Sequence, residues 1–563
     1  MSHRPSPISC PRLAGAALCL LVWAFPAWAC TSVFVGKDAS ATGHVLIARN
    51  EDYRAGWAKH FLVVPSRSVA SGEKQSFWSG MELGYPQDMT RTYRYFSVPD
   101  WIYDPKVAPG DPSQEYTPMD EVGINEKGVA VSATETQGLS AAAKVAIPLD
   151  GLIEEAQIPS IILPRAATAR QGVELFGAAI EAFGSGEAGG FAVADRDEVW
   201  YVEYQGRTWA AARVPDDRYI VVPNQKVLSN FNPYDSANFL GTASLVALAR
   251  DHHLLPEEET TEAYVRAHGL NVAKAFGTQT WKTNGVRVWW GHRHFSPSQA
   301  QAPEQAFYPF FMAPDRKITK KDIMAFLKSD NYTGTSYENP KPGVTSTARP
   351  IAVRTNLESH IVELGQSPRI PGEIGNVLWL NLGNGVDGVY LPFCQGLTAL
   401  PASFALGTDQ PEAQSPYWSF YGSSKKAQEH DDTHGTHLEA GLRGYWDPFQ
   451  DELTRSFERF QDSALRKNAT GDALASYLND QAALFSSRTI AQAQKLQGDL
   501  DAALPAGAGA VFAPTFHTGE APRAEDVPGY VAPDSGSSGC SVTGLAPFLL
   551  LLLIPALGLR RKR

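Results

Sequence analysis

Residues 27–52 read AWACTSVFVGKDASATGHVLIARNED, and the cysteine in this stretch decides how the rest of the chain is interpreted. Two arginines and an apolar run over residues 13–25 precede it, and Ala27-Trp28-Ala29 provides small residues where signal peptidase requires them. The sequence therefore predicts a secretory signal peptide over residues 1–29. Its removal would leave Cys30 as the first residue of the exported protein.

A cysteine at the N-terminus combines two catalytic groups in one residue. The thiol is a nucleophile, and the free α-amine, with a reference pKa of about 7.7–8.0, can act as a base near neutral pH. Cleavage before Cys30 would therefore create the nucleophile and its base in one step.

The residues after the cysteine predict a hairpin that returns to it. Residues 31–48 have the pattern of a strand, a turn and a second strand, so Arg49 and Asp52 would be carried back beside Cys30. A guanidinium at this place would lower the pKa of the thiol. Taken without the cysteine, Arg49 and Asp52 would be interpreted as a surface ion pair.

Lipid attachment is the alternative interpretation of Cys30, because bacterial lipoproteins are acylated on a cysteine that directly follows the signal peptide. Here Ala27 and Trp28 stand where the lipoprotein motif has a leucine-like residue and then a small one. A non-enzymatic envelope protein lipidated at Cys30 therefore remains the rival to an enzyme.

Several motifs, taken in their order along the chain, resemble a known family. Cys30-Thr31, a hairpin and then Arg49-Asn50-Glu51-Asp52 resemble the cysteine-type N-terminal-nucleophile (Ntn) hydrolases, and among them the dipeptidases of peptidase family C69. The similarity extends to about residue 484. The further similar motifs are Asn125–Val129, Ala133–Glu135, Arg213–Asp217, Asn224-Gln225, Arg287–Trp289, Ser359–Val362, Ile374–Trp379, Tyr390–Phe393 and Tyr417-Trp418.

The resemblance implies an α+β fold, the Ntn-hydrolase αββα sandwich, in which two antiparallel sheets pack between helices. The hydrophobic pattern agrees with it, since a helix is expected over residues 160–183 and an antiparallel meander of four strands between residues 191 and 222. Residues 447–504 have a helical period and are expected to form a C-terminal helical extension.

The resemblance also implies a reaction. The amine of Cys30 would take the thiol proton, the sulfur would attack an amide carbonyl, and water would hydrolyse the acyl-enzyme. Arg49 and Asp52 would orient the N-terminus, and no cofactor is expected. Dipeptides are the expected substrates, and other amides, such as the acylated or bile-salt-like conjugates of choloylglycine hydrolases, remain the alternative.

Two further catalytic residues follow from the resemblance. Asn224 stands where an oxyanion-hole or substrate-binding asparagine is expected, and Arg287 where a buried site arginine is expected. Without the resemblance, Asn224 would be a turn residue after a strand and Arg287 a surface charge.

Thr134 and Glu135 are the expected substrate-binding residues. Bile-salt-hydrolase-like relatives carry an asparagine after the strand that follows Asn125–Val129, and counting from Glu126 puts Glu135 at that position. A carboxylate there favours the dipeptidase branch, because it could bind the ammonium group of a peptide.

Composition excludes some classes of protein. The chain of 563 residues is 43 % hydrophobic and 19 % charged, typical of a soluble globular protein. Its formal net charge of −11 comes without a basic block in the main body, which argues against sequence-independent nucleic-acid binding. Of its five cysteines, Cys394 lies in an apolar run and is expected to be a small buried residue, so no disulfide framework is predicted.

The sequence divides into a signal peptide (residues 1–29), a catalytic domain (30–504), a linker rich in Ala, Gly, Pro and Ser (505–539) and a C-terminal tail (540–563).

The C-terminal tail combines Gly/Ser residues and Cys540 with an apolar run over residues 542–559 and four basic residues at 560–563. The run is a marginal membrane span with its basic end in the cytoplasm. The tail resembles the C-terminal sorting signals of bacterial envelope proteins. We therefore expect signal peptidase and a sorting machinery as processing partners, and a protein that is exported to the cell envelope and anchored by this tail or released after its processing.

A metal site is the rival chemistry. His430, His434 and His437 follow one another at offsets of four and three beside acidic residues, and His292 and His294 form a weaker pair. Thr433 and Gly435 weaken any helix that would align them, and no His-Glu-x-x-His motif is present. The expectation is a solvated loop without a catalytic metal.

The first prediction concerns the N-terminus of the exported protein. Mass spectrometry of the protein purified from the cell envelope is expected to find Cys30 as the first residue, with a free amine. A diacylglyceryl group on Cys30 would favour the lipoprotein alternative, and a start at another residue would remove the basis of the mechanism.

Overall fold

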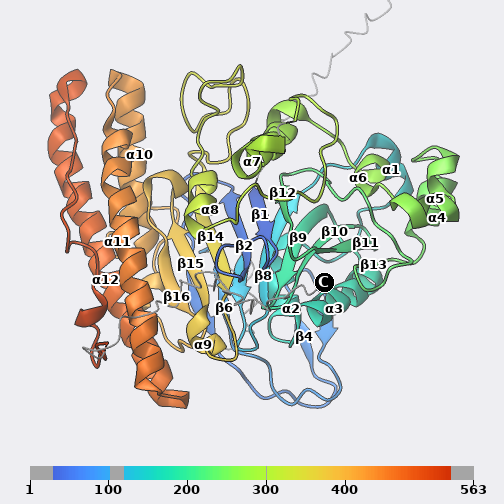
Figure 1. Ribbon diagram of the computed structural model, residues 1–563, viewed down its shortest axis with the longest axis horizontal. Helices are drawn as coiled ribbons and strands as arrows, with labels where there is room; N and C mark the ends of the chain where they lie inside the picture. The colour runs from blue at the N-terminus through green and yellow to red at the C-terminus, as the bar shows by residue number, and fades with distance from the viewer. Residues whose placement is uncertain (1–29, 102–119, 300, 534–563) are drawn as a thin grey trace, which may run out of the picture.

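A computed structural model describes residues 30–101, 120–299 and 301–533 (Figure 1). The expected signal peptide (1–29) and the tail (540–563), with Cys540, lie outside the described residues. Within the described ranges, no helix combines the length and the apolar character needed to cross a membrane.

The first sheet contains six antiparallel strands in the order β12-β1-β2-β14-β15-β16. The predicted hairpin after Cys30 is confirmed, with Ser32 opposite Arg49. The strands are β1 (Thr31–Val35), β2 (Val45–Asp52), β12 (Tyr219–Val222), β14 (Asn356–Leu364), β15 (Asn376–Leu382) and β16 (Leu391–Cys394).

The second sheet has the order β13-β11-β10-β9-β8-β7. Its strands are β7 (Val122–Ile124), β8 (Ala130–Thr136), β9 (Ala188–Ala194), β10 (Val199–Gln205), β11 (Thr208–Val214) and β13 (Phe239–Gly241). The two sheets face each other across a buried core, in which the ring of Phe34 in β1 lies 6.0 Å from that of Tyr201 in β10.

The predicted four-strand meander is correct for three strands and wrong for the fourth. Strands β9, β10 and β11 pair in sequence, but β12 crosses to the first sheet and pairs with β1. The turn before β12 packs closely on Gly36, whose amide donates to Arg218 O and where a Cβ would lie 2.4 Å from Pro215 O. The alternation of apolar residues predicts that a strand forms here but not which strand it pairs with. The pairing of β12 with β1 is set by the packing of this turn on Gly36.

Helices cover both outer faces, which completes the αββα sandwich and confirms the predicted α+β fold. On the second sheet lie α2 (Ile158–Ile162) and α3 (Ala169–Phe183), and the ring of Phe176 lies 4.6 Å from that of Phe191. The single helix predicted over residues 160–183 is thus two helices, because Thr168 caps a new one by accepting from Gln171 N.

The first sheet is covered by α7 (Val286–Phe295), α8 (Lys320–Leu327), α11 (Leu438–Lys467) and α12 (Gly471–Ala503). In Figure 1, α11 and α12 stand with α10 (Pro416–His434) beside β15 and β16. The ring of Trp379 in β15 lies 5.3 Å from that of Phe457 in α11. The helical extension predicted over residues 447–504 therefore forms part of the outer layer, and Cys394 is buried as expected.

Smaller elements connect these layers. The short strands are β3 (Leu62–Val64), β4 (Lys74–Ser76), β5 (Glu82–Gly84) and β6 (Tyr95–Ser97). Further helical segments are α1 (Ala141–Ala146), α4 (Leu245–Asp251), α5 (Glu262–His268), α6 (Val272–Phe276), α9 (Gly372–Gly375), the 3-10 turn η5 (Gly385–Asp387) and the π-helical turn η3 (Trp281–Gly285).

The linker predicted over residues 505–539 is packed in its described part. Residues 510–533, which we name the strap, run along α11, and Phe512 and Val527 are buried there. Serine hydroxyls of α11 accept from the strap backbone, with Ala524 N 2.8 Å from Ser456 Oγ. A segment rich in alanine and proline can be either a free linker or an extended segment packed on a helix. Composition alone does not distinguish the two, and it predicted a linker.

The histidine cluster is exposed at His434 and His437, as expected, but His430 and His434 lie in a helix and not in a loop. Helix α10 continues to His434 and ends at Gly435, which has a φ of 68°. His430 is buried, with Nδ1 2.8 Å from Thr436 Oγ1 and Nε2 3.2 Å from Leu504 O. Among the residues that the structure describes, no group of three His, Cys, Asp or Glu side chains is arranged to hold a metal ion.

Two glycines of α11 test the packing of the strap. A Cβ at Gly441 would lie 2.0 Å from Phe512 O, whereas a Cβ at Gly444 would meet nothing within 4 Å. Gly444→Ala is therefore expected to raise the free energy of unfolding by about 0.5–1 kcal/mol, while Gly441→Ala is expected to lower it. Chemical denaturation measures both, and equal stabilisation by the two substitutions would mean that residues 510–533 are a free linker.

Candidate active site

Cys30 lies directly before β1 and contacts the guanidinium of Arg49 from β2. Arg49 Nη2 donates to Cys30 Sγ at 2.8 Å, and both residues are buried. The contact follows from the hairpin register, which brings the end of β2 beside the start of β1. A charged donor on the sulfur stabilises the thiolate, which is the reactive form of a cysteine.

Glu121 completes this contact and was missed by the sequence analysis. Arg49 Nη1 lies 3.1 Å from Glu121 Oε2, and Glu121 is buried just before β7. Burial and the nearby Glu51 raise the pKa of Glu121 well above its usual range. A carboxyl group that resists ionisation leaves the positive charge of Arg49 available to the sulfur.

Arg287 is buried and is therefore not a surface charge, while its catalytic role stays a prediction. It lies at the start of α7, and its Nη1 donates to Cys30 O at 2.5 Å and to Thr31 Oγ1 at 2.8 Å. Burial and the charge of Arg349 lower the pKa of Arg287 to about 9.

Asn224 follows β12 and is joined to the cysteine through Arg287. Its Oδ1 accepts from Arg287 Nη2 at 3.1 Å. Its Nδ2 is buried and has no hydrogen-bond partner among the described residues. Because Arg287 occupies the oxygen, the nitrogen is the part of this amide that remains for a ligand. A buried donor of this kind is what a developing oxyanion requires.

Asn284 is a second residue that the sequence analysis missed. Its Oδ1 also accepts from Arg287 Nη2, and its Nδ2 donates to Thr280 Oγ1 at 2.6 Å. It belongs to the π-helical turn η3 that precedes α7, a geometry that is frequent at functional sites. Nothing in the local sequence marks a π-helical turn, so only the coordinates identify this contact.

Asp52, at the end of β2, is held by two residues from the segment before β14. Its carboxylate lies 2.5 Å from Arg349 Nη2 and accepts from the hydroxyl of Thr355. The predicted pair of Arg49 and Asp52 is therefore no surface ion pair, because each has its own buried partner.

The expected substrate-binding residues lie in β8, where the backbone of Glu135 pairs with Gly190 of β9. The side chains of Thr134 and Glu135 lie outside what the structure describes, so their role stays a prediction.

A layer of hydrogen-bonded, titratable side chains lies between the sheets next to Arg49. Lys59 Nζ lies 3.0 Å from Glu51 Oε2 and 2.8 Å from Asp100 Oδ1. Burial and Asp100 raise the pKa of Glu51, to about 8, against the opposing effect of Lys59. His360, opposite Arg49 in β14, joins Glu358 to Ser132 of the second sheet, with Nδ1 3.0 Å from Glu358 Oε1 and Nε2 2.9 Å from Ser132 Oγ.

Comparison with known proteins shows the family of the chain. The αββα sandwich with a cysteine before its first strand is the arrangement that the resemblance to the Ntn hydrolases implies. The model of peptidase family C69 matches residues 29–439, so the chain belongs to that family and is a hydrolase.

The similar proteins are mostly named dipeptidases. A probable dipeptidase from Latilactobacillus sakei is 32% identical over 419 residues, which cover 71% of this chain and 83% of that protein. A probable dipeptidase from Salmonella dublin is 34% identical over 380 residues, covering 66% of this chain and 81% of that protein. A variant of the conjugated bile acid hydrolase from Clostridium perfringens has a TM-score of 0.30 at 10% identity, covering 65% of this chain and 92% of that one.

Replacement of Arg49 tests its contact with the sulfur. Arg49→Met is expected to lower the thiolate fraction of Cys30 at pH 7 about 10-fold or more, because the charged donor is lost. The rate of alkylation by iodoacetamide, followed from pH 5 to 10, measures this fraction. Arg49→Lys keeps the positive charge and is expected to lower the thiolate fraction less than Arg49→Met. Arg91→Met, which removes an exposed ion pair with Glu126, serves as the control. An unchanged pH dependence in Arg49→Met would contradict the assignment.

Proposed function

We propose that this chain is an exported cysteine dipeptidase that hydrolyses dipeptides through an acyl-enzyme on Cys30. One arrangement carries the proposal: Arg49 donates to the sulfur of Cys30, and Arg287 joins the carbonyl of the same residue to Asn224. Membership of peptidase family C69 and the names of the relatives support a peptide as the substrate.

Acylation begins with the α-amine of Cys30, which becomes free when the signal peptide is removed. The amine takes the thiol proton, and the sulfur attacks the carbonyl carbon of the dipeptide. The oxygen that becomes negative accepts from Asn224 Nδ2, whose orientation is fixed by Arg287. The protonated amine then gives its proton to the leaving nitrogen, and the second amino acid departs.

Deacylation repeats these steps with water as the nucleophile. The α-amine of Cys30 takes a proton from water, the hydroxide attacks the thioester carbonyl, and the same donor binds the oxyanion. The sulfur leaves and recovers its proton, so the first amino acid is released with a free carboxylate. Arg49 remains charged throughout, because its role is to stabilise the departing thiolate.

Glu135 and Thr134 bind the substrate in this proposal. A dipeptide differs from an N-acylated amino acid by its ammonium group, and the carboxylate of Glu135 can pair with that charge. This contact distinguishes a dipeptidase from an amidase that acts on uncharged acyl groups.

Export completes the proposal. The signal peptide over residues 1–29 directs the chain across the cytoplasmic membrane, and the tail over residues 540–563 is recognised by a sorting machinery and holds or releases the enzyme at the cell envelope. Cleavage before Cys30 thus couples export to the generation of the catalytic amine.

Substrate class is tested with the mature protein and a panel of compounds. We expect turnover of dipeptides with a free N-terminus and little turnover of the same dipeptides after N-acetylation. Cys30→Ala is expected to abolish turnover and to keep the fold, which circular dichroism checks. Faster hydrolysis of acylated amino acids or bile-salt conjugates would replace the dipeptidase proposal with an amidase.

The identity of the base is tested by blocking the N-terminus. A protein made in the cytoplasm with one protease-removable residue before Cys30 keeps the thiol but converts its α-nitrogen into an amide. Because general-base assistance contributes about 10²–10⁴-fold, the extended protein should lose at least this much activity and regain it after the added residue is removed. Full activity of the extended protein would assign the base to another residue.

A further inference from the structure

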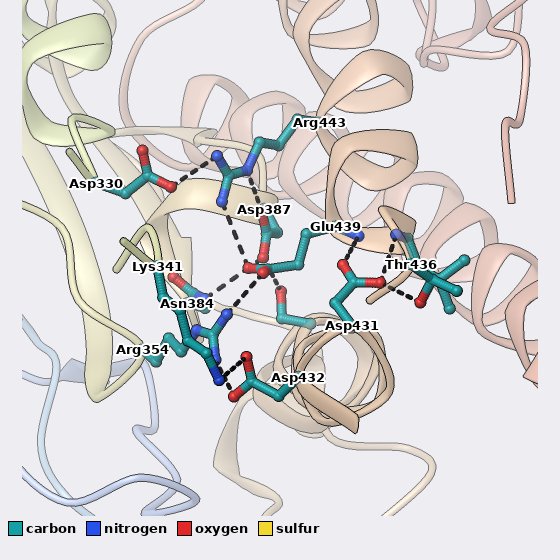
Figure 2. Close-up of polar contacts among 12 residues, drawn as sticks. Asp330, Lys341, Arg354, Asn384, Asp387, Asp431, Asp432, Thr436, Glu439 and Arg443 are labelled. Atoms are coloured by element: carbon teal, nitrogen blue, oxygen red, sulfur yellow. Dashed lines mark hydrogen bonds and ion pairs between the residues drawn. The ribbon is translucent and has the colours of Figure 1, made fainter. Parts of the chain in front are cut away.

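The corner between α10 and α11 is joined by ion pairs to the loop that holds Asp52 (Figure 2). The loop, residues 329–355, leads from the end of α8 to β14. It carries Arg349 and Thr355, the two residues that contact the carboxylate of Asp52. The α10–α11 corner, residues 431–443, includes the end of α10 and the first turns of α11.

Three residues attach the loop to the corner, one near each end and one in the middle. Near its start, Asp330 Oδ2 lies 2.7 Å from Arg443 Nη1. Near its end, Arg354 contacts Glu439 at 3.0 Å and Asp432 at 2.8 Å. In the middle, Lys341 Nζ lies 3.0 Å from Asp432 Oδ1.

The loop is also closed on itself between these attachments. Gly343 N donates to Asp330 O at 2.7 Å, and Arg354 N donates to Gly343 O at 3.2 Å. If either attached end of the loop moved, Thr355 would move with it, because Thr355 follows Arg354 in the chain.

The corner is itself rigid. The carboxylate of Asp431 accepts from Leu438 N and Glu439 N at 2.8 and 3.0 Å, which fixes the first turn of α11 against α10. Arg443 Nε lies 2.8 Å from Asp387 Oδ1, and the side chain of Asp387 is fully buried. Because Asp387 belongs to η5, which follows β15, this contact also links Arg443 to the end of β15.

We propose that the α10–α11 corner positions the active site: Glu439 and Arg443 fix the 329–355 loop, and this loop fixes the carboxylate of Asp52 through Arg349 and Thr355. The inference rests on the proposed function and on the sequence-based expectation that Asp52 orients the N-terminus of Cys30. It also adds a residue outside the family motif, since Arg443 lies just beyond the residues matched by the family model.

Electrostatics supports the geometry, because Glu439 shares its charge between two arginines. Its carboxylate faces Arg354 and Arg443, with Asp387 and Gln428 close by. Burial and the charge of Asp387 raise the pKa of Glu439 to about 7. As the pH falls through 7, Glu439 takes up a proton and both arginines lose this counter-charge, so the corner holds the loop less firmly in acid.

The experiment is a double-mutant cycle on the mature, full-length enzyme. Glu439→Gln, which keeps the shape of the side chain, and Arg443→Met are each expected to lower kcat/KM for a dipeptide roughly 10-fold. In an Asp52→Asn background the same substitutions should lower kcat/KM by less than about 2-fold, because the carboxylate of Asp52 that they position is already absent. Arg459→Met is the matched control, since it removes an exposed ion pair with Glu525 from the same helix.

A pH series gives a readout that general loss of stability would not produce. The ratio of wild-type to Glu439→Gln activity should fall towards one between pH 8 and pH 6, because the wild-type side chain becomes neutral there. Equal losses in the wild-type and Asp52→Asn backgrounds would overturn the proposal. If the dipeptidase proposal is wrong, the wild-type protein will show no dipeptide turnover. The double-mutant cycle can then be measured without a substrate, from the rate at which iodoacetamide alkylates Cys30.

Discussion

The buried guanidinium of Arg49, held between the sulfur of Cys30 and the carboxyl group of Glu121, is the interaction on which the site depends. A charge removed from water is tolerated only where it is paired and hydrogen-bonded. The fold meets this condition by placing the end of β2 between β1 and β14, with the edge of the second sheet behind it. The polar residues between the sheets, among them Lys59 and His360, extend the same pairing, so the site is a charged section of an otherwise apolar core.

Much of the fold could be predicted because it depends on local sequence. The hairpin after Cys30 and the three strands β9 to β11 have short turns and clear alternation, and both were found as predicted. The crossing of β12 to the other sheet could not be predicted, since its partner is chosen by packing against Gly36 far away in the sequence. The strap was mistaken for a linker for a related reason: its stability comes from the face of α11 and not from its own residues.

The site divides in the same way. Cys30 and Arg49 could be placed together because one hairpin relates them. Asn224 and Arg287 could be proposed only because a resemblance supplied their distant positions. Glu121, Asn284, Arg349 and Thr355 were missed, since each acts by contacting another site residue and carries no motif of its own. Residues of this supporting kind are visible only when the strands have been placed.

The topology of the first sheet has a consequence for how the protein folds. Strand β1 lies between β2 and β12, and β2 lies between β1 and β14, so two of the three strands around the nucleophile, β12 and β14, come from distant parts of the chain. Closing such large loops before any contact is gained makes folding slow and requires the chain to be present as far as β14. Partly folded chains would hold Cys30 without Arg287, Asn224 or the partners of Asp52. The surroundings of Cys30 are thus complete only when the sandwich has closed.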